Sequence, residues 1–281
     1  MDAAPISVPT EPRSAPPRPA GGARIHGIDL ARGLAMLGMV IVHYVWARDD
    51  TGPAAVVARA MEGRAMPLFM LLGGVGVVLV SRRSATPDRG LVIRAVLLLV
   101  IGLLLDATTD RIAVVLQFYG LLFLLSPLLR RLSSAVLLAL AACSTVIGAV
   151  TYQVVGQPSQ RSSSDALVDG WPFLRSLLFD GYYPFFPVGA FFALGMVLAR
   201  LDLRDRSLAR WLAGIGTAVG VGAVVMADAL VAALSIDPEP EAAVADGTFQ
   251  AARLLDASGH SAMPAWVISA AGTSVAVLGL S

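Results

Sequence analysis

The stretch that decides the fold opens the first membrane-length apolar segment and reads Asp29-Leu-Ala-Arg32-Gly-Leu-Ala-Met36-Leu-Gly-Met39-Val-Ile-Val-His43. Each residue of an α-helix turns by about 100°, so the polar and sulfur-bearing side chains of this stretch share one face. They are Asp29, Arg32, Met36, Met39 and His43. Ionisable side chains are costly inside a bilayer. We therefore expect this polar stripe to face a protein interior or a wet cavity and not lipid.

The composition excludes an ordinary soluble domain. Hydrophobic residues make up 56% of the 281 residues and charged residues only 15%, whereas a soluble domain is about 25% charged. All 21 basic residues are Arg, and the net charge of +1 provides no bulk field for nucleic acid. The single Cys143 excludes an intramolecular disulfide, and the three widely separated histidines give no metal-ligand spacing. We expect no metal site and no nucleic-acid partner.

Apolar runs predict an all-α polytopic membrane bundle of about eight spans, because a spanning helix needs about 20 mostly apolar residues. The predicted spans are 27–47, 64–81, 91–106, 111–129, 134–155, 184–200, 208–235 and 265–281. Residues 1–23 are rich in Pro, Ala, Ser and Gly and predict a disordered cytoplasmic tail. Residues 24–281 are predicted to form one transmembrane domain. Its last span reaches Ser281 without a polar flank, a pattern expected of a C-terminally truncated chain.

The loop charges predict the orientation. With eight spans, thirteen Arg residues fall on the side of the N-terminus and seven on the other side, with Arg32 inside the membrane. Cytoplasmic loops carry the excess of Arg and Lys, so the sequence predicts a cytoplasmic N-terminus in the plasma (inner) membrane. The opposite side receives two long loops, 156–183 and 236–264.

The first candidate site is the stripe itself. His43 lies at its far end, where a buried histidine is a candidate general base. Asp29 and Arg32 are three residues apart and form a neighbouring pair on one helix face. The alternative is structural: Asp29 and Arg32 form an intrahelical ion pair near the surface, and His43 bonds a backbone carbonyl.

Further candidates lie outside the stripe. Arg82, Arg83, Arg89 and Arg94 could grip the phosphates of a nucleotide-bearing donor, or determine topology and contact lipid headgroups; Arg94 lies inside a span and needs a partner. His260 could join His43 at an outer-face site or remain a solvated loop histidine. Asp228 and Asp106 are intramembrane acids and hence functional candidates, unless they reach the headgroups. Small-residue faces at Gly73-Gly74-Val-Gly76 and Gly214–Gly220 predict close helix packing.

Several motifs resemble one family. Arg24-x-x-x-Ile28-Asp29-Leu-Ala-Arg32-Gly33-Leu-Ala resembles the opening of the heparan-α-glucosaminide N-acetyltransferase catalytic-domain family and its bacterial relatives. The same phrase, with a histidine eleven residues after the arginine, is similar to the first helix of integral-membrane O-acyltransferases. Weaker matches follow in family order: Gly63-Arg64-Ala-Met-Pro67-Leu-Phe69 before Gly73-Gly74, Leu116-Gln117-Phe-Tyr119-Gly120-Leu, Ala193-Leu-Gly195-Met196 and Gly259-His260-Ser261.

The resemblance implies a multi-span acyltransferase. Acetyl-CoA would enter from the cytoplasm as donor, and its acyl group would pass to a sugar or glycan-like hydroxyl or amine near the outer face. His43 would be the catalytic base, supported by Asp29 and Arg32, and Arg32, Arg89 and Arg94 would bind the donor. His260 and Asp228 would lie on the acceptor side. Arg32 and His43 are about 16 Å apart along a helix, on the order of the length of a pantetheine arm.

Two other classes remain open from the sequence. A small-solute or lipid transporter would also line a cavity with polar side chains, although no pair of broken helices in repeated halves is present. A non-catalytic membrane partner protein is the third reading, and truncation would favour it.

Overall fold

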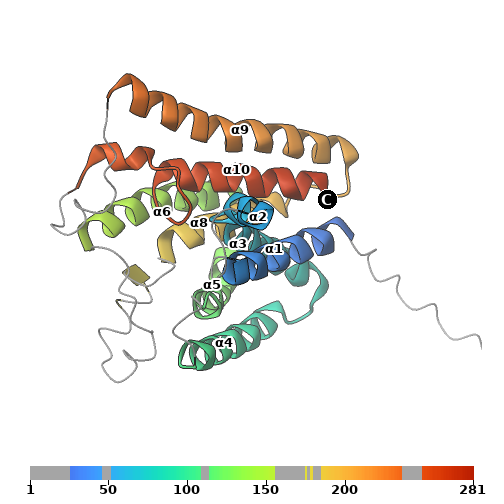
Figure 1. The fold of residues 1–281 in the computed structure, drawn as a ribbon. Helices are drawn as coiled ribbons and strands as arrows, with labels where there is room; N and C mark the ends of the chain where they lie inside the picture. The colour runs from blue at the N-terminus through green and yellow to red at the C-terminus, as the bar shows by residue number, and fades with distance from the viewer. Residues whose placement is uncertain are drawn as a thin grey trace, which may run out of the picture.

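The computed structural model describes residues 26–45, 52–108, 114–155, 175, 178–179, 185–235 and 249–281. Within these residues the architecture is all-helical (Figure 1). The elements are α1 (His26–Val45), α2 (Pro53–Met61), α3 (Ala65–Arg83), α4 (Pro87–Asp106), α5 (Leu116–Leu129), α6 (Ser134–Val155), α8 (Phe185–Leu198), α9 (Arg206–Ala233), a 3₁₀ turn η2 (Ala251–Leu255) and α10 (Pro264–Leu280). The predicted tail 1–23 lies outside the described residues.

Every predicted span coincides with a helix, but fewer than eight are long and apolar enough to cross a membrane. Four helices meet both criteria among the described residues: α1, α3, α6 and α9. Three others, α5, α8 and α10, are apolar but have 14, 14 and 17 residues, less than the roughly 20 that a perpendicular span needs. The all-helical membrane class is confirmed, and the predicted number of full-length spans is too high.

Local sequence sets where the helices begin. Proline occupies the first turn of α2, α4 and α10, where its missing N–H is not needed and its fixed φ favours the helix. Asp205 caps α9, because its side chain accepts a hydrogen bond from the Ser207 backbone N–H at 2.8 Å. The short α2 was not predicted, although Gly52 followed by Pro53 is a helix-start signal.

The centre of the bundle is the crossing of α3 and α8. Most residues of both helices are buried, and the two backbones approach at glycines on each side. A Cβ on Gly74 would overlap the Phe192 carbonyl, and one on Gly195 would overlap the Leu71 carbonyl. Small residues permit such close packing in membrane helices. The predicted packing role of Gly73-Gly74 is confirmed at Gly74.

The outer helices expose apolar side chains, as lipid-facing helices do. Val92 and Leu97 of α4 and Val146 of α6 are about half exposed. Helix α9 packs along α10 at the edge of the bundle (Figure 1). Gly216 and Gly220 of α9 lie against α10, whereas Gly214 has no neighbour within 4 Å. Only part of that glycine stripe therefore makes the predicted contact.

Candidate functional site

His43 is held at the C-terminal end of α1 by its own helix. Its Nδ1 donates a hydrogen bond of 2.6 Å to the Met39 carbonyl, four residues back. A carbonyl only accepts, so the proton of neutral His43 resides on Nδ1, and no hydrogen bond from a described residue reaches Nε2. The backbone thus fixes the ring orientation and leaves one nitrogen available as a base.

The loop before α10 is built from polar side-chain caps. The Ser258 backbone N–H donates to the Asp256 carboxylate at 2.9 Å, and the Ser261 hydroxyl donates to the Asp256 carbonyl at 3.0 Å. His260 adopts a left-handed backbone with φ of 66°, which a non-glycine residue adopts only when its surroundings enforce it. Its ring lies 5.9 Å from the ring of Trp266, centroid to centroid.

A second turn, between α2 and α3, docks against this loop. The Trp266 indole N–H donates to the Gly63 carbonyl at 3.0 Å. Glycine is needed at position 63 for two reasons. A Cβ there would lie 2.5 Å from the Gly259 Cα, and the backbone φ of +64° is one that residues with a side chain rarely adopt. On the other side, Gly38 of α1 lies against Ala65 and Met61. The turn therefore links α1 to the loop that carries His260.

This arrangement brings His43 and His260 into electrostatic range. Burial, and then the nearby charge of His43, lower the pKa of His260 to about 4, so His260 is neutral near pH 7. We call the end of the bundle formed by His43, the turn 62–64 and the loop 256–263 the His end. Two sequence candidates far apart in the chain thus lie together.

The polar stripe of α1 lies at the border of the helix's buried face. The buried residues Ile28, Ala31 and Ala35 form the neighbouring face of the helix. Met36, which belongs to the polar stripe, is 53% exposed. The expectation that the whole stripe faces inward is therefore wrong at Met36. The small side chains on the neighbouring line are the ones that let α1 approach α3.

Arg32 and Tyr119 meet on the face of α3. Arg32 Nη1 is 3.7 Å from Asp29 Oδ1, and the two side chains are 43% and 35% exposed. Arg32 Nη2 would be 3.1 Å from a Cβ on Gly76, and the Tyr119 hydroxyl occupies the space that a Cβ on Gly73 would need. The Arg32 charge also acts on Tyr119. The sequence did not single out Tyr119; its only signal was its place in a family motif.

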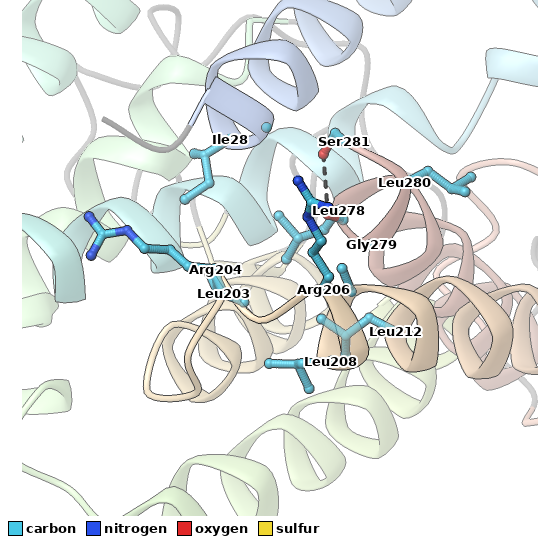
Figure 2. Close-up of a pocket in the computed structure, with 12 residues that line it drawn as sticks. Ile28, Leu203, Arg204, Arg206, Leu208, Leu212, Leu278, Gly279, Leu280 and Ser281 are labelled. Carbon is cyan, nitrogen blue, oxygen red and sulfur yellow. Dashed lines mark hydrogen bonds between the residues drawn. The ribbon is translucent and has the colours of Figure 1, made fainter. Parts of the chain in front are cut away.

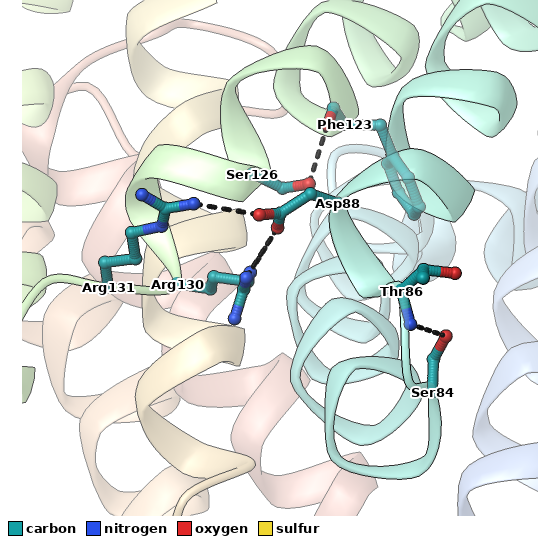
Figure 3. A network of polar contacts seen from close by, with 7 residues as sticks. All are labelled: Ser84, Thr86, Asp88, Phe123, Ser126, Arg130 and Arg131. Atoms are coloured by element: carbon teal, nitrogen blue, oxygen red, sulfur yellow. Dashed lines mark hydrogen bonds and ion pairs between the residues drawn. The ribbon is translucent and has the colours of Figure 1, made fainter.

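At the opposite end of the bundle, two arginine side chains form a network around Asp88 (Figure 3). Asp88 accepts hydrogen bonds from Arg130 Nε at 2.6 Å and Arg131 Nη2 at 2.9 Å, and these bonds lower the pKa of Asp88 to about 2. Arg200 donates to the Ser134 hydroxyl at 3.1 Å and the Leu132 carbonyl at 2.7 Å. We call this the Arg-rich end.

The remaining candidates are not drawn into either site. Arg89, Arg94 and Asp228 are exposed. No hydrogen bond or ion pair joins Arg94 to a described residue, so the partner expected for it is missing there. Ala227 is the residue of that turn buried in the bundle, and Asp228 points away from it. Asp106 is buried at the end of α4.

A cavity lies beside the start of α1 at the Arg-rich end (Figure 2). Its walls combine apolar side chains such as Ile28 and Leu212 with Arg204 and Arg206. It is separate from the His end. Among the residues that the structure describes, no group of three or more His, Cys, Asp or Glu side chains could hold a metal ion.

Comparisons with known proteins agree with the motifs. Neither a curated protein nor a solved structure matches the chain. The sequence profile described as "Heparan-alpha-glucosaminide N-acetyltransferase, catalytic" matches residues 24–225, which include α1, the Gly63 turn and Tyr119 but not His260. Because this match covers more than half of the chain, the protein belongs to the heparan-α-glucosaminide N-acetyltransferase catalytic-domain family.

Proposed function

We propose that this protein is a membrane acetyltransferase that moves an acetyl group from cytoplasmic acetyl-CoA to a hydroxyl or amine of a glycan-like acceptor near the opposite face. The family supports an acetyltransferase-type function and an acyl-CoA donor. The observation that most directly supports the chemistry is His43, whose Nδ1 is bonded to Met39, whose Nε2 has no hydrogen-bond partner among the described residues, and whose charge acts on His260. A fixed imidazole with one open nitrogen is what general-base catalysis requires.

In the proposed reaction, the acceptor oxygen or nitrogen attacks the carbonyl carbon of the thioester. His43 Nε2 takes the acceptor's proton as the new C–O or C–N bond forms. The C–S bond then breaks, and the leaving thiolate recovers that proton from His43 to become the CoA thiol. Atoms and charge balance without a further reactant.

His260 fits a supporting role on the acceptor side. Burial and the charge of His43 both oppose its protonation, so the pair disfavours holding a second proton. The proton that His43 takes from the acceptor is therefore retained on His43 until the leaving group collects it. Neutral His260 can hydrogen-bond the acceptor meanwhile.

The charge distribution supports entry of the donor from the cytoplasm. At the Arg-rich end, hydrogen bonds from Arg130 and Arg131 to Asp88 join α4 to the end of α5. A hydrogen bond from Arg200 to Ser134 joins the end of α8 to α6. An excess of Arg marks cytoplasmic loops, so we propose that this end, with the N-terminus, faces the cytoplasm. The donor's phosphates would then meet guanidinium groups such as Arg89 while its acyl group reaches toward the His end.

The test uses purified full-length protein in detergent with acetyl-CoA labelled in the acetyl group and a panel of amino sugars, beginning with glucosamine. An acetyltransferase forms labelled, acetylated acceptor and an equal amount of CoA. In liposomes, a transporter would instead move the acceptor sugar with the donor left intact. Solute uptake without label transfer would overturn the proposal, as would the absence of both activities across the panel.

A further inference from the structure

Two hydrogen-bond donors lie on one face of α3 without an acceptor among the residues that the structure describes. Gly73 and Gly76 are three residues apart and so lie on the same helix face. The Tyr119 hydroxyl from α5 fills the space beside Gly73, and Arg32 Nη2 from α1 lies beside Gly76. Side chains from two helices that are distant in sequence therefore point at the same strip of glycine backbone.

Neither donor is satisfied within the described residues. The Tyr119 hydroxyl makes no hydrogen bond there, and the 3.7 Å between Arg32 and Asp29 is an ion-pair distance longer than a hydrogen bond. A guanidinium has five donors, and one carboxylate at that distance leaves most of them unused. The Arg32 side chain is 43% exposed, so its unused donors are open to a ligand. Two such donors on one helix face suit a ligand with acceptor oxygens.

The Tyr119 side chain is held rigidly by its neighbours. Its ring centroid lies 4.9 Å from that of Phe69 and 4.8 Å from that of Phe123, and it meets Phe192 edge-on at 6.4 Å. Aromatic contacts on several sides fix the direction of the hydroxyl. A hydroxyl kept in place this way is suited to positioning a ligand.

The two donors are also ordered along the proposed path of the donor substrate. Helix α3 runs from the His end at Ala65 to the Arg-rich end at Arg83. Gly73 is therefore about 4.5 Å closer to the His end than Gly76. A ligand that enters past the arginines would meet Arg32 first, Tyr119 next and His43 last.

We propose that Tyr119 and Arg32 bind the amide carbonyls of the donor's pantetheine arm along the glycine face of α3, with Tyr119 as a positioning residue. This inference rests on the proposed function, which supplies acyl-CoA as the donor. The arm is a thin, largely apolar chain interrupted by amides. Gly76 has no side chain and lets such a chain approach the α3 backbone beside Arg32, whereas the space at Gly73 is taken by Tyr119 itself. Phe69 offers an apolar wall, and the two donors match the carbonyl oxygens of the arm.

Two substitutions test this without disturbing the fold. Tyr119→Phe removes only the hydroxyl and keeps the ring contacts. Gly76→Ala adds a Cβ 3.1 Å from Arg32 Nη2, the far end of a flexible side chain that can move aside, yet the methyl group occupies the strip where the arm would lie. The matched controls are Tyr44→Phe, at an exposed tyrosine, and Gly189→Ala, whose Cβ would make an ordinary 3.7 Å contact.

The measurement is equilibrium affinity of the full-length protein in detergent for acetyl-CoA and for adenosine 3′,5′-bisphosphate, which lacks the pantetheine arm. The Tyr119→Phe variant loses one hydrogen bond, so it should bind acetyl-CoA about five- to tenfold more weakly than wild type. Gly76→Ala should weaken it at least as much, and Arg32→Lys, which keeps charge but loses the planar fork, should also weaken it. The affinity of Tyr119→Phe and Gly76→Ala for the bisphosphate, and of both controls for either ligand, should match wild type.

The outcomes separate this inference from the proposed function. If Tyr119→Phe and Gly76→Ala bind acetyl-CoA as wild type does, or lose both ligands equally, the arm does not lie on this face. If wild type binds acetyl-CoA and shows the expected selective losses but acetylates no acceptor, the donor site stands and the transferase function fails. Where transfer is measurable, Tyr119→Phe should raise KM for acetyl-CoA with kcat changed by less than about twofold.

Discussion

The two ends of this bundle use polar residues in opposite ways. At the Arg-rich end, Asp88 is shared by Arg130 and Arg131 in a partly exposed network of side-chain hydrogen bonds. At the His end, His43 is bonded to a backbone carbonyl, and the turn at Gly63 is bonded by Trp266. Exposed ion pairs contribute little and tolerate change, whereas backbone-anchored groups fix geometry. This difference supports our proposal that the Arg-rich end receives the donor and that the His end carries the chemistry.

If the two ends have these separate roles, they must lie on opposite sides of the membrane. In a Cys143→Ala background, a cysteine at Ser258 should react with an impermeant maleimide added to intact cells, and a cysteine at Ser84 should react only after lysis. Both serines are exposed, one at each end. The reverse labelling pattern would invert the proposed orientation.

The largest kinetic effect is expected at the His end. His43→Ala should lower the acetyl-transfer rate by about 10²–10⁴-fold, the usual contribution of a general base, without loss of membrane insertion. His26→Ala is the matched control, because His26 is an exposed histidine at the other end of the same helix. If the two variants transfer acetyl at the same rate, His43 is not the base.

A structural variant tests the contact between the turn at Gly63 and the loop that carries His260. Gly63→Ala should lower the stability by roughly 1–3 kcal/mol, because alanine is strained at this backbone conformation and its Cβ would strike the Gly259 backbone. This contact also positions His260, so the acetyl-transfer rate should fall together with the stability. Gly33→Ala, with open space at its Cβ, should leave both unchanged. The two variants are compared by thermal unfolding in detergent. Equal melting temperatures would show that the contact at Gly63 does not stabilise the fold.

The lowered pKa of His260 predicts a pH dependence of stability. Because the folded-state pKa is about 4 and the ordinary value is 6.5, the unfolded chain binds the proton first as pH falls. Stability should therefore be full above pH 6.5, decline between pH 6.5 and 4, and decline no further from this group below pH 4. His260→Gln should flatten this part of the curve. A wild-type curve with the same slope as the variant would show that His260 is not buried as described.

The smallest effect is expected at the Arg-rich end. Asp88→Asn should lower the melting temperature only slightly at neutral pH, and less at high salt, because the network is exposed. Its pKa is lowered to about 2, so the network's contribution should be present above about pH 4 and fade as pH falls toward 2. Arg89→Gln, at an exposed arginine outside this network, is the control. A loss as large as that of Gly63→Ala would contradict the division between the two ends.

Hydropathy was enough to place the α-helices other than the short α2. The prediction of 134–155 coincides with α6, and 208–235 differs from α9 by two residues at each end. Periodicity identified the face of α1 that carries Arg32 and His43, but it could not show that the adjacent line with Ala31 is the buried one. Which face packs depends on the partner helix, here α3.

The site was predictable only in part. His43 stood out as an ionisable group in an apolar run, and His260 through its motif, but their proximity depends on the Gly63 turn, which no local pattern reveals. Tyr119 lies in an aromatic, apolar segment where a hydroxyl resembles any core tyrosine. Conversely, Arg94 and Asp228 stood out as charges within spans, yet both lie on exposed faces. Charge inside an apolar run identifies candidates, and only packing decides among them.

Under the proposed function, donor and acceptor reach the site from opposite ends of the bundle. Membrane vesicles of one orientation, established by the Ser84 and Ser258 cysteines, can be given labelled acetyl-CoA on one side and glucosamine on the other. We expect labelled acetylglucosamine only when acetyl-CoA is on the Arg-rich side and glucosamine is on the His side, and none with His43→Ala. Transfer that requires both substrates on the same side would contradict it.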